Sequence, residues 1–369
     1  MKLLVTGAKG FIGKNLCAYI EANGLGELLP YDRDTDPSLL DTYADACDFV
    51  FHLAGVNRPA DEAGYEENVT FTKRLLESLM RCRKSVPVLV SSSIQARYDN
   101  AYGRSKKRAE ELVFDYAAAT GAPVYVYRLP GVFGKWCAPN YNSVVATFCH
   151  NAARGLPLRV DDPDKVIELA YIDDVTAAFA GALDGVVKRR GSYCVVPMTH
   201  HVSVGDLAKI IESFRSRPGL FVPDVGDILV RQLYSTYLSY LPEDDLAQPL
   251  AVHRDERGFF AECVKSCSAG QVSVNVARPG VTRGGHWHQT KAETFFVVSG
   301  EGVIRIKKLG EDRVYEYAVS GEEPQAVTIP PGYIHEVTNT GAKDLLMLIW
   351  ASEVFDPQNP DTFAAKMDE

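Results

Sequence analysis

The chain has 369 residues, more than one ordinary domain requires, so we expect two domains of unequal size. Hydrophobic residues make up 46% of the sequence and charged residues 24%, a composition that can bury full cores. The net charge of −9 argues against a general affinity for nucleic acid or anionic membranes, and an anionic ligand would need a local basic pocket.

The sequence also carries signals of its compartment. No stretch approaches 18 consecutive apolar residues, so we expect no membrane insertion. Residues 1–6 read as a strand that leads into a turn, not as a secretory signal. The eight cysteines show no paired spacing, which is typical of reduced thiols. We therefore expect a cytoplasmic protein.

The first third of the chain alternates between strand-like and helix-like segments. In chain order these segments are residues 3–5, 13–21, 48–53, 67–80, 88–91, 105–119 and 124–127. The alternation is typical of βαβ units. It predicts a Rossmann-like α/β fold, a doubly wound parallel sheet with helices on both faces.

After residue 250 the pattern changes to short strand-like runs separated by Gly and Pro turns. The clearest runs are residues 295–298, 303–306, 326–329 and 345–349. This pattern predicts an antiparallel all-β sandwich or barrel. An acidic stretch bracketed by prolines at residues 242–249 marks the boundary, so we expect an α/β domain at 1–243 and a barrel at 250–369.

A glycine-rich turn follows the first predicted strand. Gly7, Gly10 and Gly13 open the next helix, where backbone can approach a pyrophosphate and the helix N-terminus offers free N–H groups. This context predicts a dinucleotide site. At the expected end of the second strand, Asp32 favours the free ribose of NAD, whereas Arg33 can accommodate the 2′-phosphate of NADP. We favour NADP on the strength of Arg33.

A second motif follows the strand at residues 88–93. Tyr102 and Lys106 are four residues apart at the start of a predicted helix, so both project from one face. A nearby ammonium favours the phenolate and can bind ribose hydroxyls. Ser93 is placed to hydrogen-bond a substrate carbonyl oxygen. A surface Tyr and Lys on a polar helix is the alternative interpretation.

The predicted barrel contains a cluster of candidate metal ligands. His286 and His288 alternate with Trp287, so both imidazoles point to one face of a strand. Glu293 follows closely, and His335 comes after a Pro-Pro-Gly turn that can bring a second strand alongside. Three imidazoles and one carboxylate suit zinc, nickel or iron. A metal that only braces the barrel is the alternative to a catalytic one.

The first half resembles the extended short-chain dehydrogenase/reductase family, especially its nucleotide-sugar members. The motifs that carry the resemblance are Thr6-Gly7-x2-Gly10-x2-Gly13, Asp48-x3-His52-Leu53-Ala54-Gly55, Asn68-Val69, Ser91-Ser92-Ser93, Tyr102-x3-Lys106 and Tyr171-Ile172-Asp173-Asp174-Val175. The resemblance implies that Tyr102 is the general acid, Ser93 the polarising group and Lys106 the cofactor anchor.

The resemblance also leads us to expect particular binding residues. The expected contacts of the cofactor are Gly7, Lys9, Gly10, Phe11, Ile12, Gly13, Asp32, Arg33, Leu53, Ala54, Gly55, Asn68, Tyr102, Lys106 and Arg128. The substrate is expected at Ser93, Lys135 and Asn142, because residues 135–143 are rich in groups suited to sugar and phosphate contact.

The second half resembles the cupin superfamily. Its two motifs appear as Gly280-x5-His286-x-His288-x4-Glu293-x6-Gly300 and Pro330-x-Gly332-x2-His335-x3-Asn339. The resemblance implies a double-stranded β-helix barrel in which Asn339 is structural. It is consistent with Zn²⁺, or another divalent metal, on His286, His288, Glu293 and His335.

The whole chain resembles the CapF-type capsular polysaccharide enzymes, through residues 54–59, 134–137 and 233–240. That resemblance implies a UDP-sugar substrate. The cupin would epimerise C3 of UDP-2-acetamido-2,6-dideoxy-4-hexulose, and the reductase would reduce the C4 ketone with NADPH to the L-talose sugar, on the route to UDP-N-acetyl-L-fucosamine. We also expect a homodimer. Two rivals are a single-activity reductase or 4-epimerase with a non-catalytic cupin, and an iron oxygenase.

Overall fold

The structure is a computed structural model and describes residues 1–82, 84–215, 221–247, 250–266 and 268–367. The chain divides into two compact units, Met1–Glu212 with Ser235–Leu241, and Ser213–Tyr234 with Pro242–Glu369. Of the predicted boundary segment, Gln248 and Pro249 lie outside the described residues. Within the described part of the chain, every helix is too short or too polar to cross a bilayer.

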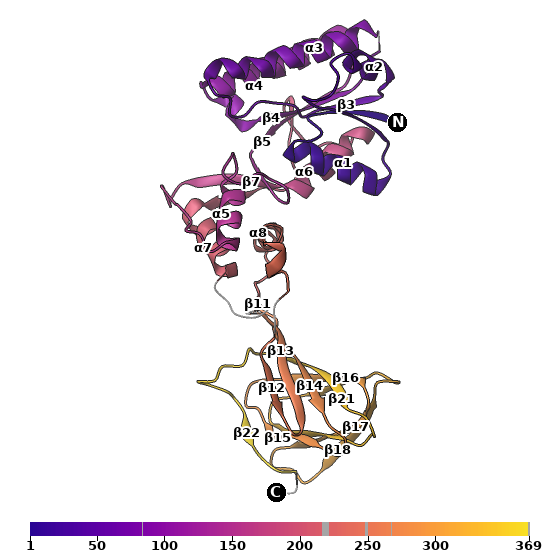
Figure 1. The fold of residues 1–369 in the computed structure, drawn as a ribbon, viewed down its shortest axis with the longest axis vertical. Coiled ribbons are helices and arrows are strands. Elements are labelled where there is room, and N and C mark those ends of the chain that lie inside the picture. The colour runs from indigo at the N-terminus through magenta and orange to yellow at the C-terminus, as the bar shows by residue number, and fades with distance from the viewer. Residues whose placement is uncertain (83, 216–220, 248–249, 267, 368–369) are drawn as a thin grey trace. The chain divides into compact units, whose positions relative to one another are not determined.

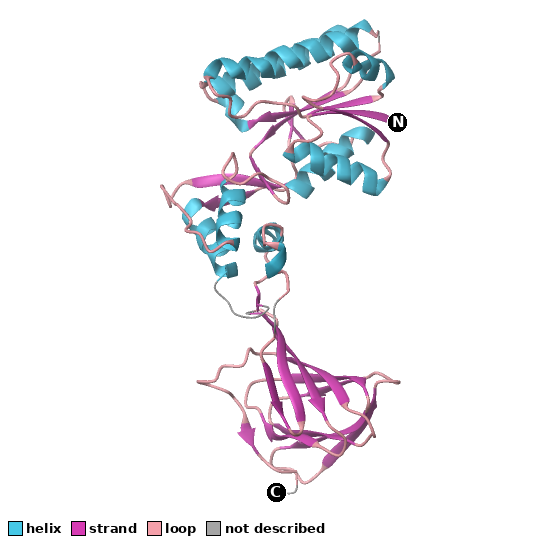
Figure 2. Cartoon of the chain, viewed as in Figure 1, coloured by secondary structure: helices cyan, strands magenta, loops and turns pink. Residues whose placement is uncertain are grey.

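A mostly parallel sheet forms the centre of the first unit (Figures 1 and 2). Its strands, in spatial order, are β2 (Glu27–Tyr31), β1 (Lys2–Thr6), β3 (Phe49–His52), β4 (Val88–Ser93), β5 (Val124–Leu129), β9 (Tyr193–Cys194) and β8 (Arg189–Arg190). The final strand, β8, is antiparallel to β9. A smaller sheet holds β10 (His200–Ser203), β7 (Val166–Tyr171) and β6 (Gly131–Phe133).

Helices cover both faces of the parallel sheet (Figure 1). The α-helices of the chain are α1 (Phe11–Asn23), α2 (Leu39–Ala46), α3 (Glu67–Arg81), α4 (Ala101–Thr120), α5 (Val144–Ala153), α6 (Ile172–Gly181), α7 (Val204–Arg215) and α8 (Ile228–Leu238). Short 3₁₀ turns are η1 (Glu62–Glu66), η2 (Ile94–Arg97), η3 (Ala182–Asp184) and η4 (Glu243–Asp245).

The core of the first unit follows from the two-residue period of its strands. Along β1, Leu3 and Val5 pack with α1 and α6 on one face, whereas Leu4 packs with α2, α3 and α4 on the other. The same division continues along β3 and β4. Strands buried on both faces read as continuous apolar runs, as the sequence showed. The predicted doubly wound parallel sheet is confirmed.

Two local features place the ends of α1 and α4. A side chain at Gly13 would lie 2.1 Å from the Gly7 carbonyl oxygen, so only glycine lets α1 start against the preceding turn. The Asn100 carboxamide caps α4 by accepting the backbone N–H of Gly103 at 2.7 Å. This cap fixes the first turn of α4, which carries Tyr102 and Lys106.

Apart from the end of α7, most of α8 and the short turn η4, the second unit consists of strands that form two sheets. One sheet has β11 (Phe221–Val222), β13 (Gly258–Ser266), β14 (Gly270–Ala277), β21 (Leu345–Ala351), β16 (Glu293–Ser299) and β19 (Ala326–Ile329), with β12 (Val252–Asp255) paired to β13. The other has β18 (Val314–Ser320), β17 (Glu301–Lys308), β20 (Tyr333–Asn339), β15 (Thr282–Trp287) and β22 (Phe363–Ala364).

The two sheets of the second unit enclose a buried apolar core. Phe295 and Val297 of β16 meet Ile304 and Ile306 of β17 in this core, and Val337 of β20 joins them. The pairing register of β15 and β20 determines which of their polar side chains face inward. It places His286 of β15 directly opposite His335 of β20. The all-β second domain predicted from the turn pattern is confirmed.

Candidate functional site

The first unit has a cavity at the carboxyl edge of its parallel sheet. It measures about 600 Å³ and is lined by residues of the glycine turn, the serine run and the start of α4, including Gly7, Gly10, Phe11, Ile12, Gly13, Ser91, Ser92, Ser93, Tyr102, Lys106 and Asn142. An adjoining cavity of about 500 Å³ shares Gly7, Gly10, Leu53 and Gly55 with it. Open α/β sheets bind ligands in a crevice of this kind.

The residues of the smaller cavity fit a dinucleotide. The glycine turn brings the N-terminus of α1 to its wall, where free N–H groups favour phosphate. The Asp32 carboxylate accepts the backbone N–H of Lys9 at 2.8 Å and that of Arg33 at 2.9 Å, so it also braces the turn. Exposed cationic side chains of Lys9, Arg33 and Arg74 line the same cavity.

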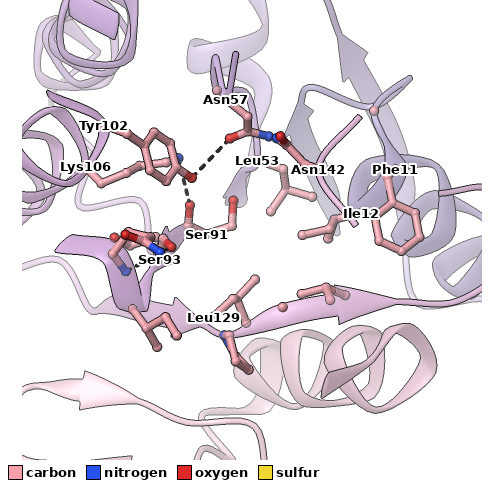
Figure 3. A pocket seen from close by; sticks show the side chains of 18 of the residues that line it. Phe11, Ile12, Leu53, Asn57, Ser91, Ser93, Tyr102, Lys106, Leu129 and Asn142 are labelled. Atoms are coloured by element: carbon pink, nitrogen blue, oxygen red, sulfur yellow. Dashed lines mark hydrogen bonds between the residues drawn. The ribbon is translucent and has the colours of Figure 1, made fainter. Parts of the chain in front are cut away.

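Tyr102 projects from α4 into the larger cavity, as Figure 3 shows. Its hydroxyl donates to Oδ1 of Asn57 at 3.1 Å. Burial raises the pKa of Tyr102 to about 12, although a hydrogen bond with Ser93 opposes the shift. The phenol is therefore protonated at neutral pH, the form that can give a proton to a carbonyl oxygen.

Lys106 and Ser93 complete the group around Tyr102. The Lys106 ammonium is buried and donates to the Ser91 carbonyl oxygen at 3.2 Å. Burial lowers the pKa of Lys106 to about 8, while the nearby Glu110 carboxylate opposes the shift. Ser93 Oγ accepts the backbone N–H of Gln95 at 3.1 Å, and its hydroxyl is in hydrogen-bonding contact with Tyr102. The three predicted catalytic residues thus line one cavity.

Two predicted binding residues point elsewhere. The Arg128 guanidinium donates to the buried Glu110 carboxylate and to the Tyr193 hydroxyl at 2.7 Å, and Arg128 lines neither cavity. Lys135 forms an ion pair with Asp173 and also lies outside both linings. The remaining predicted cofactor and substrate residues line one or both of these cavities. They are Gly7, Lys9, Gly10, Phe11, Ile12, Gly13, Asp32, Arg33, Leu53, Ala54, Gly55, Asn68, Ser93, Tyr102, Lys106 and Asn142.

The structure adds residues that sequence reasoning missed. Asn57 bonds to Tyr102, and Tyr65 and Gln95 line the same cavity. Arg74 of α3 lines the smaller cavity together with Asn68 and Phe71 of the same helix. Arg74 comes seven residues after Glu67 and three after Phe71, a spacing that puts side chains on one side of a helix, but neither residue was an expected contact.

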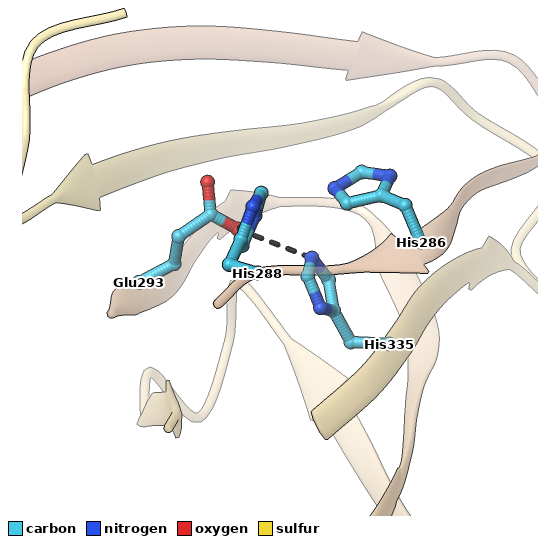
Figure 4. Close-up of side chains that lie close together, drawn as sticks. All are labelled: His286, His288, Glu293 and His335. Carbon is cyan, nitrogen blue, oxygen red and sulfur yellow. Dashed lines mark ion pairs between the residues drawn. The ribbon is translucent and has the colours of Figure 1, made fainter. Parts of the chain in front are cut away.

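The second unit brings together His286, His288, Glu293 and His335 (Figure 4). One ligand atom from each lies within 4.8 Å of the others. The His286 ring has its pKa lowered to about 4 by burial, with further contributions from the neighbouring imidazoles. A neutral imidazole is the form that binds a metal.

Hydrogen bonds to the backbone fix the orientation of two of these rings. His288 Nδ1 lies 2.6 Å from the Asp361 carbonyl oxygen, and His335 Nδ1 lies 3.2 Å from that of Tyr333. A carbonyl can only accept, so each Nδ1 carries hydrogen and each Nε2 presents a lone pair. Both Nε2 atoms are buried, and Glu293 Oε2 lies 3.5 Å from that of His288 and 3.1 Å from that of His335.

This arrangement places lone pairs against a carboxylate. When the rings are neutral, these short nitrogen–oxygen distances set lone pairs against each other, and only a protonated ring could form an ion pair with Glu293. A divalent cation would satisfy all of these atoms at once, and imidazoles whose Nδ1 donates to a carbonyl are the usual metal ligands. The residues therefore fit a metal, and they line a cavity of about 560 Å³.

Both halves of the chain match known protein families. Residues 3–195 match the NAD dependent epimerase/dehydratase family, and residues 253–363 match the polysaccharide biosynthesis C-terminal domain. The UDP-2-acetamido-2,6-beta-L-arabino-hexul-4-ose reductase of Pseudomonas aeruginosa is 44% identical over 371 residues, which cover all of both chains.

Solved structures give the same picture. The capsular polysaccharide assembling protein CapF from Staphylococcus aureus has a TM-score of 0.91 and 41% identity, covering 99% of this chain and 100% of that one. A UDP-glucuronic acid 4-epimerase from Bacillus cereus has a TM-score of 0.52 and 20% identity over 59% of this chain and 84% of its own. The latter likeness supports the fold of the first unit alone.

The lone-pair arrangement predicts the effect of removing a ligand. His288→Ala or His335→Ala should lower the bound metal, measured by elemental analysis, and the thermal transition of the second unit. Metal bound to the folded state alone stabilises that state by about 1.4 kcal/mol for each tenfold excess over Kd. His253→Ala is the control, because His253 lines the same cavity outside the cluster. Unchanged metal content in both ligand variants would contradict the assignment.

Proposed function

This chain belongs to the family of CapF-type capsular polysaccharide enzymes, and on that premise we propose that it acts twice on one UDP-4-keto-sugar. The second unit epimerises C3 of UDP-2-acetamido-2,6-dideoxy-4-hexulose, and the first reduces the C4 ketone with NADPH. The product is UDP-2-acetamido-2,6-dideoxy-L-talose, on the route to UDP-N-acetyl-L-fucosamine. The observation that carries the proposal is the protonated Tyr102 in a cavity that adjoins the dinucleotide cavity.

The reduction needs a proton donor beside the ketone. The Tyr102 phenol gives its proton to the C4 oxygen, and the Lys106 ammonium stabilises the phenolate that remains. Ser93 donates a hydrogen bond to the same carbonyl oxygen and holds it next to Tyr102. Bound NADPH supplies the hydride that reaches C4. A relative that carries the name of a hexulose reductase supports this assignment.

The choice of NADPH rests on charge in the dinucleotide cavity. Arg33, Lys9 and Arg74 are cationic and line it, and only NADPH carries a 2′-phosphate. Asp32 would favour a free ribose, but its two oxygens already accept backbone N–H groups. The balance of these groups therefore favours NADPH over NADH.

The epimerisation needs an acidic C–H bond. A hydrogen on C3 is acidified by the ketone at C4, because its removal by a base gives an enolate, and a proton returned to the opposite face of C3 completes the epimerisation. His286, His288, Glu293 and His335 would hold Zn²⁺ or another divalent metal, which would supply positive charge that stabilises an enolate. Reduction then removes the ketone and fixes the new configuration at C3. This order gives a chemical reason for joining the two units.

Separate sites predict separable activities. Tyr102→Phe should lower the rate of NADPH consumption by about 10² to 10⁴, the usual contribution of a general acid. Exchange of the C3 hydrogen with D₂O, followed by NMR without NADPH, should continue at the wild-type rate. Tyr98→Phe is the control, because Tyr98 is exposed and lines neither cavity. Loss of exchange in folded Tyr102→Phe would contradict the proposal of two separate sites. Absence of exchange by the wild-type protein would instead show that the cupin is not catalytic.

The cation cluster predicts a selective loss of NADPH. Arg33→Ala should weaken NADPH binding by about 10-fold to 100-fold, since a charge-assisted hydrogen bond contributes about 1.5 to 3 kcal/mol. NADH binding, measured by the same fluorescence titration, should change little. Arg97→Ala, which removes an arginine outside both cavities, serves as the control. Equal losses of affinity for NADPH and NADH would show that Asp32, and not Arg33, determines the choice of cofactor.

A homodimer is part of the proposal. Phe296 and Val298 of β16 and Leu348 and Trp350 of β21 are each more than a third exposed on the outer face of one sheet. Phe296 is paired with Leu348, and Leu348 in turn with Val274 of β14, so the apolar surface crosses three neighbouring strands. Contiguous apolar patches of this kind mark interaction surfaces. We infer that a second copy covers it.

The apolar face predicts a change in mass. Leu348→Glu should convert a dimer into a monomer, measured by light scattering after gel filtration, because the charge would be buried in the interface. Tyr317→Glu is the control, since Tyr317 is similarly exposed but lies on β18 of the other sheet. A monomeric wild-type protein would refute the proposal.

A further inference from the structure

The cavity of the second unit contains polar groups that the metal cluster does not use. Arg283 of β15 and Asn275 of β14 line it together with His286, His288 and Glu293. They belong to neighbouring parts of the wall, because the Arg283 guanidinium donates to the carbonyl oxygen of Val276, at 3.2 Å, next to Asn275.

A β-bulge turns Arg283 toward the cluster. Arg283 and His286 are three residues apart, so in a regular strand they would point to opposite faces. The register instead shifts between Gly284 and His286, and Gly284 and Gly285 have φ of +104° and +73°. Arg283 thus pairs with Val337 while His286 pairs with His335, and these two partners face the same side. The bulge places a cation and the metal ligands on one face.

The Arg283 cation is only partly used by the protein. Among the described residues, its guanidinium donates a hydrogen bond to one carbonyl oxygen, whereas a guanidinium has five N–H donors. In the described ranges, no carboxylate lies within ion-pair distance of it, and the nearby Asp255 pairs with Arg257. Burial lowers the pKa of Arg283. A partly buried cation of this kind favours an anionic ligand.

The side-chain oxygen of Asn275 lacks a hydrogen-bond donor. Its side chain is 8% exposed, and its Oδ1 is buried without a hydrogen-bond partner among the described residues. Asn339, another buried asparagine of this unit, accepts the N–H of Gly341 and donates to the carbonyl oxygens of Ala277 and Lys343. A buried acceptor without a donor destabilises the fold, so an unpaired amide in a cavity wall points to a ligand.

We propose that Arg283 and Asn275 bind the ligand of this cavity, an anionic keto sugar held by a diphosphate oxygen at Arg283 and an N–H or O–H donor at Asn275. The identity of the ligand as a UDP-sugar rests on the proposed function. A chain with a net charge of −9 needs a local cation to hold a diphosphate, and Arg283 supplies one beside the metal ligands. A guanidinium also matches phosphate geometry with two parallel hydrogen bonds.

The first test counts binding sites with UDP itself. Isothermal titration of the full chain should show two UDP sites, one in each unit, and Arg283→Gln should retain one. Arg313→Gln is the matched control, because it removes the same charge from an exposed arginine outside the cavity. Equal stoichiometry in wild type and Arg283→Gln would overturn the proposal, whether or not the second unit is an epimerase.

The second test separates binding from chemistry. In C3 exchange with the UDP-4-keto-sugar in D₂O, Arg283→Gln should raise KM at least tenfold and change kcat less than twofold. An unchanged KM with a lower kcat would overturn the diphosphate contact, because Arg283 would then act on the enolate. Absence of exchange by wild type would refute the epimerase proposal but not the UDP site counted by titration.

Asn275 allows a test in which stability and binding move apart. Asn275→Leu removes an unpaired buried acceptor, so its melting temperature should equal or exceed that of wild type while KM for exchange rises. Asn339→Leu removes three hydrogen bonds and should lower the melting temperature. Metal content should remain at the wild-type level in Asn275→Leu and Arg283→Gln. An Asn275→Leu protein with lower melting temperature and unchanged KM would show a structural role and overturn the assignment.

Discussion

Parallel strands all end at the same edge of a sheet, and the chemistry of the first unit depends on that constraint. β1 leads into the glycine turn, β3 into Leu53 to Gly55, and β4 ends in Ser93, so three separate sequence motifs meet at this edge. The Asn100 cap then starts α4 at the same edge and delivers Tyr102. A shift of one residue in any strand would send its terminal polar groups to the other face.

The second unit depends on a different constraint, the cost of burying lone pairs. Backbone carbonyls hold His288 and His335 with Nε2 directed at Glu293, an arrangement that is unfavourable without a cation. The same reasoning applies to Asn275, whose unpaired oxygen lies in the wall of that cavity. Among the described residues of this unit, the buried atoms without a hydrogen-bond partner, on Asn275, His288 and His335, all lie in the wall of that cavity, which favours a ligand there.

The sequence predicted features that local pattern determines and missed those set by tertiary contact. The strand-turn-helix at Gly7 to Gly13 and the His-x-His alternation both follow from short-range periodicity. The edge strand β2 was located only by its expected end near Asp32, since it contains Pro30 and is largely not buried, so its own pattern is weak. Arg128 follows Val126 by two residues, so it faces α4 and meets Glu110, a partner that no local signal identifies. Asn57 likewise reaches Tyr102 across 45 residues.

The proposed chemistry also imposes an order on the two reactions. The C3 hydrogen is acidic only while C4 is a ketone, so a sugar that is reduced first keeps its original configuration at C3. Exchange must therefore outpace reduction, or the reductase cavity must reject the unepimerised sugar. Sites that hydrogen-bond a substrate hydroxyl can discriminate strongly, because a misplaced hydroxyl leaves buried polar groups unpaired. Asn57 and Asn142 line the cavity beside Tyr102 and supply amide groups for that purpose. Selection in the reductase cavity would then make the flow through both units run in one direction, since hydride transfer removes the group on which the reverse epimerisation depends.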